Sequence, residues 1–236
     1  MILKKIKKFF FVLTNPFFYK ACIHGVFPLI EVKKIFFNIK KLDYIIDVGS
    51  NKGQFSLLVL KYFPKIKIFS FEPQLHLINI QKKILQNSKF YNICLGNKNF
   101  KHALNLTERA DSSSLLEPLL INNPIYKTKK KITVKVKKLD NVLNLPFAKI
   151  KLLKIDVQGY ELEVLKGSKK KLNGIDYILL EISSKEMYKN QPPKTKIISF
   201  LRKKNFKLIK VLNKSYTDNY WQADYLFFNI KKSIIH

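Results

Sequence analysis

The sequence has very little arginine, and this limits what its strong positive charge can mean. The formal net charge is +29, yet only Arg109 and Arg202 are arginines among the 45 basic residues. Guanidinium groups hold phosphates and base edges with two hydrogen bonds at once, so their scarcity argues against a dedicated nucleic-acid-binding protein. The lysines either cover solvated faces or draw the chain towards anionic membranes and acidic glycans.

Cysteine is also scarce. Cys22 and Cys94 lie far apart in the sequence, and neither has a companion cysteine or histidine at the spacing of a metal site. A disulfide framework and a structural zinc site are therefore not expected. Cys94 suits the interior of a strand as a small apolar residue. Free cysteines of this kind agree with a reducing cytoplasm, which is where we expect the protein.

Long apolar runs are missing as well. The run at residues 9–13 is shorter than the roughly 7–15 residues of a signal-peptide core. No run reaches the roughly 18 residues of a membrane-spanning helix, so we expect neither secretion nor a membrane span. The basic, aromatic segment 2–19 could lie peripherally in the interface of an anionic membrane, or it could be an ordinary helix packed on the domain. The sequence leaves both open.

The 236 residues, 47% of them apolar, suit one domain with a substantial core. Strands and helices alternate from residue 44 onwards, which predicts an α/β fold with a mostly parallel sheet. We divide the chain into a helical, basic extension at residues 1–40 and a main domain at residues 41–236. An insertion at about 97–138 interrupts the alternation, and it contains a half-buried strand with apolar residues at every second position.

The glycine pattern after the first strand predicts a nucleoside-cofactor site. The strand at residues 44–48 runs into Asp47-x-Gly49-x-Asn51-x-Gly53, and a helix follows at once. Glycines at such a turn let a ligand approach the backbone and the helix N-terminus. The next strand, residues 67–71, ends at Glu72, whose carboxylate could hold both hydroxyls of a ribose. The predicted cofactor-binding residues are Asp47, Gly49, Asn51, Gly53, Glu72, Pro73, Leu95 and Gly96, the last two beside the adenine.

The cofactor that suits this turn best is S-adenosylmethionine. The dinucleotide fingerprint needs Gly-x-Gly-x-x-Gly, whereas here the spacing is Gly49-x-x-x-Gly53 with Asp47 ahead of it. A carboxylate at that position repels phosphates and suits the cationic amino-acid end of S-adenosylmethionine. A NAD site is the weaker alternative, and a purely structural glycine turn is another.

Two carboxylates in the second half of the chain belong to the same edge of the predicted sheet. Asp156 follows the strand at residues 151–155, and Glu181 lies near the end of the strand at 177–182. Ligands bind beyond the carboxyl ends of parallel strands, so both should face the crevice that holds Asp47 and Glu72. Asp156 is the candidate general base, although it could instead cap the next helix or order the cofactor. Asp156 and Glu181 together could also hold magnesium.

Four parts of this sequence resemble the FkbM-type S-adenosylmethionine-dependent methyltransferases. They are residues 46–55, with Asp47-Val48-Gly49-Ser50-Asn51, the Phe71-Glu72-Pro73 step, Leu139-Asp140, and residues 153–167 around Asp156-Val157-Gln158-Gly159. The resemblance covers roughly residues 40–230. Gln158 departs from it, because the family often has Glu there, which puts an acid–base or metal role of that position in doubt.

The resemblance implies a Rossmann-like class I methyltransferase fold, and the final hairpin implies an antiparallel strand at the edge of a seven-stranded sheet. The implied activity is O-methylation, commonly of a sugar hydroxyl in a polysaccharide, lipopolysaccharide or glycosylated metabolite. Ser112, Ser113 and Ser114 resemble a recurring feature of the family and, with Glu181, are the candidate substrate-binding residues. A solvated turn with a helix cap is the alternative for the serines.

Two other functions remain open at this stage. The chain could be an N-methyltransferase of nucleic acid or protein, although such enzymes often carry Asp/Asn-Pro-Pro-Tyr where this chain has Asp156-Val157-Gln158-Gly159. It could also be a non-catalytic basic adaptor on a methyltransferase fold. The intact set of Asp47, Gly49, Gly53 and Glu72 argues against an adaptor, because an adaptor does not need a cofactor site.

Overall fold

The computed structural model describes residues 2–119, 123–146, 149–217 and 220–232. Its centre is a seven-stranded sheet in the order β3-β2-β1-β7-β8-β10-β9. The strands are β1 (Tyr44–Val48), β2 (Lys67–Phe71), β3 (Ser88–Tyr91), β7 (Lys151–Ile155), β8 (Tyr177–Ser183), β9 (Phe206–Thr217) and β10 (Tyr220–Asn229). The predicted bounds of β1, β2 and β7 are confirmed.

The sheet is parallel except for β10. This strand pairs antiparallel with both β8 and β9, so it lies one position in from the edge. The hairpin predicted from the last two strands is therefore present, with longer strands than the sequence suggested. Because the order reverses between β1 and β7, the carboxyl ends of those two strands form the crevice where α/β sheets bind ligands.

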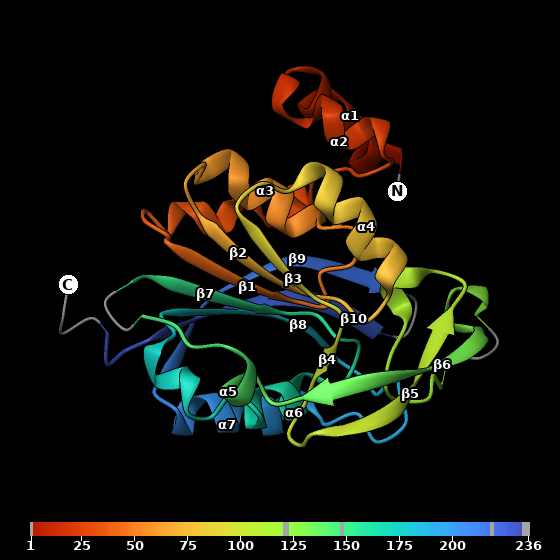
Figure 1. Ribbon diagram of the computed structural model, residues 1–236, viewed down its shortest axis with the longest axis vertical. Coiled ribbons are helices and arrows are strands. Elements are labelled where there is room, and N and C mark those ends of the chain that lie inside the picture. The colour runs from red at the N-terminus through yellow and green to blue at the C-terminus, as the bar shows by residue number, and fades with distance from the viewer. Residues whose placement is uncertain (1, 120–122, 147–148, 218–219, 233–236) are drawn as a thin grey trace.

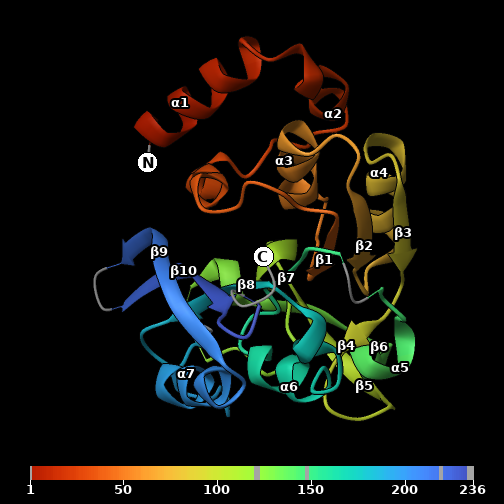
Figure 2. The same ribbon diagram turned by 90° about the vertical axis from the view of Figure 1, so that its left-hand side faces the viewer.

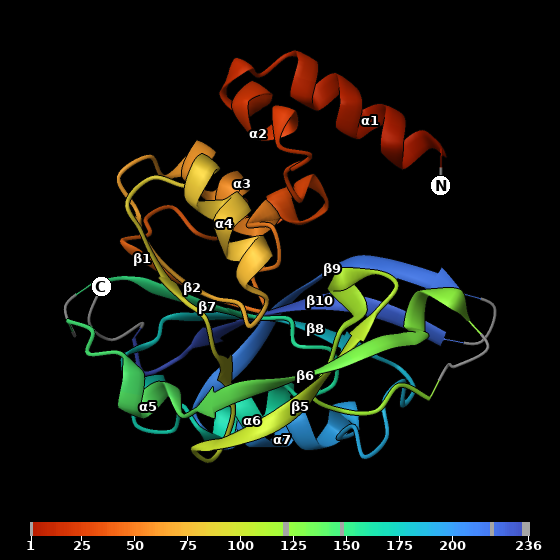
Figure 3. The ribbon, with the colours of Figure 1, turned by 45° about the vertical axis from the view of Figure 1, so that its right-hand side comes forward.

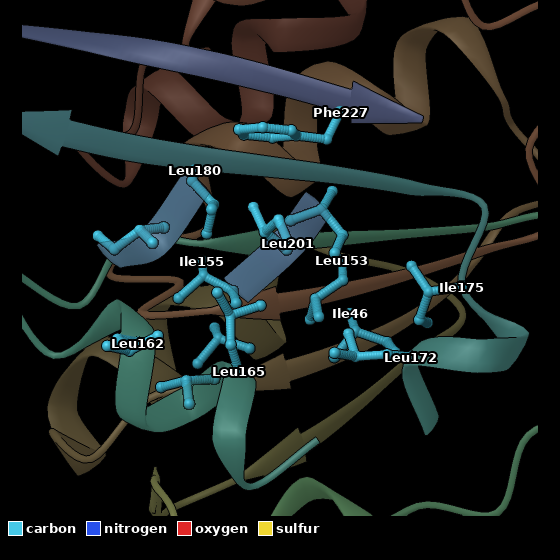
Figure 4. Close-up of a cluster of buried hydrophobic side chains, with 14 of the residues drawn as sticks. Ile46, Leu153, Ile155, Leu162, Leu165, Leu172, Ile175, Leu180, Leu201 and Phe227 are labelled. Carbon is cyan, nitrogen blue, oxygen red and sulfur yellow. The ribbon is translucent and has the colours of Figure 1, made fainter. Parts of the chain in front are cut away.

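Helices cover both faces of the sheet (Figure 1). On one face lie α3 (Gln54–Tyr62) and α4 (Leu75–Ile84), and on the other lie α5 (Leu139–Val142), α6 (Glu161–Lys166) and α7 (Lys194–Lys203). The strands in the middle are buried on both sides, which is why they read as continuous apolar runs. Figure 4 shows one face of this core, where Ile46, Leu153 and Ile155 of the strands meet Leu165 of α6 and Leu201 of α7.

The insertion forms a second, three-stranded sheet. Its strands are β4 (Cys94–Leu95), β5 (Phe100–Thr107) and β6 (Thr128–Lys137), in the order β4-β6-β5. The alternation predicted around Val134 and Val136 is confirmed, because both are buried. Short 3-10 turns lie nearby at η3 (Ala110–Ser112) and η4 (Pro124–Tyr126), and a third, η5 (Lys171–Gly174), precedes β8.

The third strand is a correction to the sequence-based expectation. The residue pattern at 90–95 by itself predicts one continuous third strand, but β3 ends at Tyr91 and the chain leaves the main sheet. The Asn92 side chain donates to the carbonyls of Glu72 and Pro73, at 3.1 and 2.7 Å. Beyond it, Cys94 and Leu95 pair with β6. The partner strand lies some forty residues later, so local pattern could not reveal the break.

The N-terminal extension is helical, and its helices are interrupted near Pro16 and Pro28. It comprises α1 (Ile2–Leu13), η1 (Pro16–Phe18), α2 (Tyr19–Ile23) and η2 (Ile30–Phe37). Phe18, Val32 and Ile35 are buried in the same cluster as Leu58 of α3, so the extension packs on the helical layer of the main domain. In Figures 2 and 3, α1 is the element farthest from the sheet. Among the described residues, no helix has the length and apolar character needed to cross a membrane.

Candidate cofactor and acceptor site

The glycine turn after β1 needs glycine for two separate reasons. Gly49 has a φ of +71°, and a Cβ there would lie 1.9 Å from the carbonyl oxygen of Asp156. Gly53 has a φ of +83°, and a Cβ there would lie 2.9 Å from Leu85 Cδ1. At Gly49 the turn lies too close to the loop after β7 for a side chain, and at Gly53 it lies too close to the end of α4. Asn51, at φ 49°, takes the left-handed conformation that asparagine tolerates.

A buried glutamine that sequence reasoning missed supports this turn from behind. Gln81 of α4 is fully buried, and its Nε2 donates to the carbonyl of Asn51 and to Ser50 Oγ. The hydroxyl of Ser70 on β2 donates to Gln81 Oε1. The signal was a polar residue on the apolar face of a helix, at one turn from Leu77.

Glu72 lies at the end of β2 with 4% of its surface exposed. Its two oxygens accept the backbone N–H groups of Asn51 and Gln74, each at 2.9 Å. Burial raises the pKa of Glu72 to about 7, while those two N–H groups act to lower it. Each oxygen makes one hydrogen bond, and the carboxylate lines a pocket, so it can accept further donors from a ligand.

That first pocket is formed at the ends of β1, β2, β4 and β7. Apolar side chains of Phe71, Ile93, Leu95 and Val157 contribute to its wall. Of the predicted cofactor-binding residues, those that line it are Gly49, Asn51, Glu72, Pro73 and Leu95. The arrangement is an apolar slot with a carboxylate at one side, and it suits a flat base joined to a ribose.

The other three predicted cofactor-binding residues lie behind this wall. Asp47 is fully buried, and its Oδ2 accepts the hydroxyl of Ser56 at 2.7 Å. Gly53 is the N-cap of α3. A Cβ on Gly96 would meet Val136 Cγ1 at 2.8 Å rather than open space. These three residues do not line the first pocket, and they support the residues that do.

Lys154 was not singled out from the sequence, and it occupies the centre of the site. Its Nζ lies 3.5 Å from Asp47 Oδ1, 3.3 Å from Asp156 Oδ2 and 3.2 Å from the carbonyl oxygen of Gly49. Burial alone would lower the pKa of Lys154, but the carboxylates of Asp156 and Asp47 outweigh it and hold that pKa above its usual value. The side chain is therefore a buried, permanent cation. A lysine within the apolar strand Leu152–Ile155 was the available signal.

The loop after β7 is organised by Gln158. This residue has a φ of 56°, and its Nε2 donates to Asp156 Oδ1 at 2.8 Å and to Glu181 Oε2 at 3.0 Å. The Tyr188 hydroxyl lies 3.0 Å from Gln158 Oε1. An amide can bridge two carboxylates in this way, whereas a glutamate would add a third negative charge. The departure from the family pattern thus has a defined structural role.

Asp156 does not cap the following helix, which was one alternative. The N-cap residue of α6 is Tyr160, without a side-chain cap hydrogen bond. Glu161 holds the loop before the helix instead, because its Oε1 accepts the N–H groups of Val157 and Gly159 at 3.3 and 3.0 Å. Burial raises the pKa of Glu161 to about 7. Asp156 is left half-exposed to both pockets of the site.

A second pocket adjoins the first, and Gly49, Asn51, Asp111, Asp156 and Gln158 line both. Its wall is rich in polar side chains from β8, β9, β10 and the insertion, which are Arg109, Ser112, Asn123, Glu181, Asn213, Gln222 and Asp224. Burial and the Asp156 carboxylate raise the pKa of Glu181 well above its usual range. Burial also raises the pKa of Asp224 to about 7. The wall of this pocket thus brings carboxyl groups together with the cations Arg109 and Lys154.

Two of the three serines connect the insertion to the main domain, and the third bonds within the insertion. Ser114 Oγ donates to the carbonyl of Gln158 at 2.6 Å, and the carbonyl of Ser112 lies 2.8 Å from the Tyr188 hydroxyl. Ser113 Oγ accepts the N–H of Thr107 at 3.2 Å. Ser113 and Ser114 line the first pocket, and Ser112 lines the second. Substrate binding by these serines stays a prediction.

A metal site is not assembled by the described residues. No group of three or more His, Cys, Asp or Glu side chains there is placed to hold an ion. Asp156 and Glu181, the pair considered for magnesium, are joined instead by the amide of Gln158.

Comparison with known proteins points to one family. A profile of the methyltransferase FkbM domain matches residues 47–208. Methyltransferase 1 of the fungus Beauveria bassiana (strain ARSEF 2860) is 29% identical over 147 residues, which are 53% of this chain and 58% of the relative. The match therefore spans less than two thirds of that protein.

Solved structures share the fold at low identity. Methyltransferase FkbM from Methylobacillus flagellatus KT superposes with a TM-score of 0.50 and 11% identity, over 79% of this chain and 43% of that one. Magnesium protoporphyrin IX methyltransferase from Synechocystis PCC 6803, solved with bound S-adenosylmethionine, gives a TM-score of 0.46 and 9% identity, over 85% of this chain and 76% of that one.

Proposed function

The chain belongs to the FkbM methyltransferase family and has the class I methyltransferase fold. From that premise we propose that it transfers the methyl group of S-adenosylmethionine to a hydroxyl of a sugar, in a polysaccharide, lipopolysaccharide or glycosylated metabolite. One observation carries the proposal. Asp156 and Gln158 line both a nucleoside-shaped pocket and a polar pocket, so a methyl donor and an acceptor hydroxyl can meet beside them.

The first pocket fits the cofactor. Glu72 offers the ribose a buried carboxylate whose oxygens each make one hydrogen bond within the protein. Phe71, Ile93 and Leu95 supply an apolar wall for adenine. The carboxylate of Asp156 faces the region where the two pockets meet, which suits the positive charge of a sulfonium and of an amino-acid end.

The second pocket fits a polyhydroxylated acceptor. Glu181 and Asp224 present carboxyl oxygens that accept hydroxyl donors, and Asn213 and Gln222 present amides that both donate and accept. The sugar proposal therefore draws its support from the chemistry of the pocket wall.

Methyl transfer requires the acceptor oxygen, the methyl carbon and the sulfur in line, and bound S-adenosylmethionine would supply the methyl group and the leaving sulfur. In such a transfer the acceptor oxygen would bond to the methyl carbon as the carbon–sulfur bond broke, and Asp156 would take the hydroxyl proton. Lys154 and Gln158 hold the two oxygens of Asp156, so its carboxylate is fixed in place. Glu181 would orient the acceptor by accepting a hydrogen bond from a second hydroxyl of the sugar.

The test has two stages. Calorimetric titration with S-adenosylmethionine and NAD should show micromolar binding of S-adenosylmethionine alone. Transfer of a radiolabelled methyl group should then be measured to glycan extracts, to RNA and to a basic protein. Base-stable label in the glycan fraction supports the proposal. Label only in RNA or protein, or tight NAD binding, would overturn it.

A further inference from the structure

Helix α1 exposes an apolar stripe where a surface helix would ordinarily be polar. Ile6, Phe9, Phe10 and Leu13 follow the spacing i, i+3, i+4 and i+7, which places them on one face. All four are exposed, with 57% of Phe9 and 60% of Phe10 accessible. Large aromatic side chains in this number are costly to leave in water.

The other face of α1 already has its partner. Val12 is buried and Phe11 packs with it in the cluster that contains Phe18. Lys8 lies 3.8 Å from Glu31 of η2. The orientation of the helix is thus set by contacts within the chain, and its apolar stripe faces outward for that reason.

The stripe continues along the rest of the extension. Phe17, Tyr19, Ile23 and Phe27 are exposed as well, and 82% of Ile23 is accessible. Figures 2 and 3 show that α1 and α2 follow one another on the side of the molecule away from the sheet. These eight residues, from Ile6 to Phe27, are called the outer apolar face below.

The segment that carries this face is rich in lysine and almost without acidic residues. Residues 1–42 contain a single acidic residue, Glu31, which Lys8 already pairs. Their lysines are Lys4, Lys5, Lys7, Lys8, Lys20, Lys33, Lys34, Lys40 and Lys41. Lys61 of α3 lies 5.8 Å from the ring centre of Phe17. The face therefore combines aromatic side chains with an uncompensated positive charge.

We propose that the outer apolar face docks on the surface of an anionic lipid bilayer. Amphipathic helices with lysines and exposed phenylalanines bind in the interface by burying their apolar side chains among the acyl chains, while the lysines meet anionic headgroups. The charge argues for this occupant over a second copy of the chain, because two such faces would bring their lysines together.

The extension that carries the outer apolar face also contributes to the second pocket. Leu29, which directly follows the outer apolar face in the chain, lines the second pocket. Its N–H donates to the carbonyl of Gln54 at the start of α3, at 3.2 Å. The extension and the mouth of the pocket are thus physically joined, and the membrane interaction does not depend on which acceptor is used.

Vesicle flotation of the full chain tests the proposal. Vesicles of phosphatidylcholine alone are compared with vesicles that also contain about 30% phosphatidylglycerol, each at low and at high salt. We expect binding to the anionic vesicles that weakens with salt. Equal binding to both compositions, or none to either, would overturn it. A salt-resistant dimer in sedimentation, with no vesicle binding, would assign the face to a second copy.

Two matched variant pairs separate the outer apolar face from general surface effects. The double variant Phe9→Ser and Phe10→Ser should weaken binding by about tenfold or more. Phe100→Ser, which changes an exposed phenylalanine on β5, should not. Lys20→Glu with Lys34→Glu should weaken binding, whereas Lys169→Glu with Lys170→Glu, the same change of charge next to α6, should have less effect.

Each variant is first checked by its S-adenosylmethionine affinity and thermal unfolding, so that a folding defect is recognised. If a variant fails that check, the vesicle binding of the unaltered chain, and its dependence on lipid composition and salt, still decides the outcome. Equal loss of binding in the Phe9/Phe10 double variant and in Phe100→Ser would contradict the assignment.

Discussion

Lys154 holds its ammonium group 3.3 Å from the carboxylate of Asp156, and both belong to the sheet's central crevice. The same ammonium group lies 3.5 Å from Asp47. One buried cation therefore serves the carboxylate behind the glycine turn and the carboxylate at the junction of the two pockets. Lys154 therefore contributes both to the stability of the fold, through Asp47, and to the proposed chemistry, through Asp156.

Replacing Lys154 by methionine should lower the free energy of unfolding by about 3–5 kcal/mol, because it leaves buried carboxylates without their cation. Urea denaturation measures the loss. Adding Asp47→Asn to Lys154→Met should recover part of it, since one uncompensated charge is then removed. A double variant less stable than either single one would contradict this account.

Changing Asp156 to asparagine should lower kcat by about 100-fold or more while leaving the affinity for S-adenosylmethionine within a few-fold. The amide keeps the shape of the side chain and loses the proton acceptor. Rates are measured with radiolabelled cofactor once an acceptor is found. Full turnover by Asp156→Asn would move the base to another residue, with Glu181 as the next to test.

Glu72→Gln should weaken S-adenosylmethionine binding by about tenfold or more, because a charged acceptor for the ribose hydroxyls is replaced by a neutral amide. The pKa of Glu72 is raised to about 7, so the affinity of the unaltered chain should also fall as the pH drops from 8 to 6. Calorimetry at both values checks this. The variant should show a flatter pH profile, and an equally steep one would assign the effect elsewhere.

Gly49→Ala should destabilise the protein more than Gly25→Ala. Both glycines have a left-handed φ, +71° and +68°, so both substitutions carry a similar backbone penalty of about 1–2 kcal/mol. A Cβ on Gly25 meets nothing within 4 Å, whereas one on Gly49 would collide with the carbonyl of Asp156. Thermal unfolding of the two variants isolates that contact, and similar losses would refute its importance.

The protein without ligand should be more stable near pH 5 than near pH 8. Burial raises the pKa of Glu72, Glu161 and Asp224 to about 7 each, above the values of the unfolded chain. The folded state then binds more protons, so stability is greatest below the unfolded pKa values and decreases as the pH rises through 7. Urea denaturation at several pH values measures the slope. Glu161→Gln should reduce it, and an unchanged slope would contradict the role of Glu161.

Local patterns determined the parts of this protein that depend on neighbouring residues. The apolar runs predicted β1, β2 and β7, because strands buried on both faces need continuous apolar side chains. The glycine spacing located the cofactor turn, since a left-handed backbone after a strand leaves few alternatives to glycine and asparagine. Family membership followed from the same stretches.

Only the tertiary structure decided which distant groups meet. The break between β3 and β4 depends on pairing with β6, and the role of Lys154 depends on Asp47 of the neighbouring strand β1 as well as on Asp156 at the end of its own strand. The amide of Gln158 joins Asp156 and Glu181 across β7 and β8, and Gln81 braces Asn51 from α4. The sequence by itself named the chemical groups and their strands. Packing determined their partners, because a buried group can form hydrogen bonds and ion pairs only with the atoms that the fold places beside it.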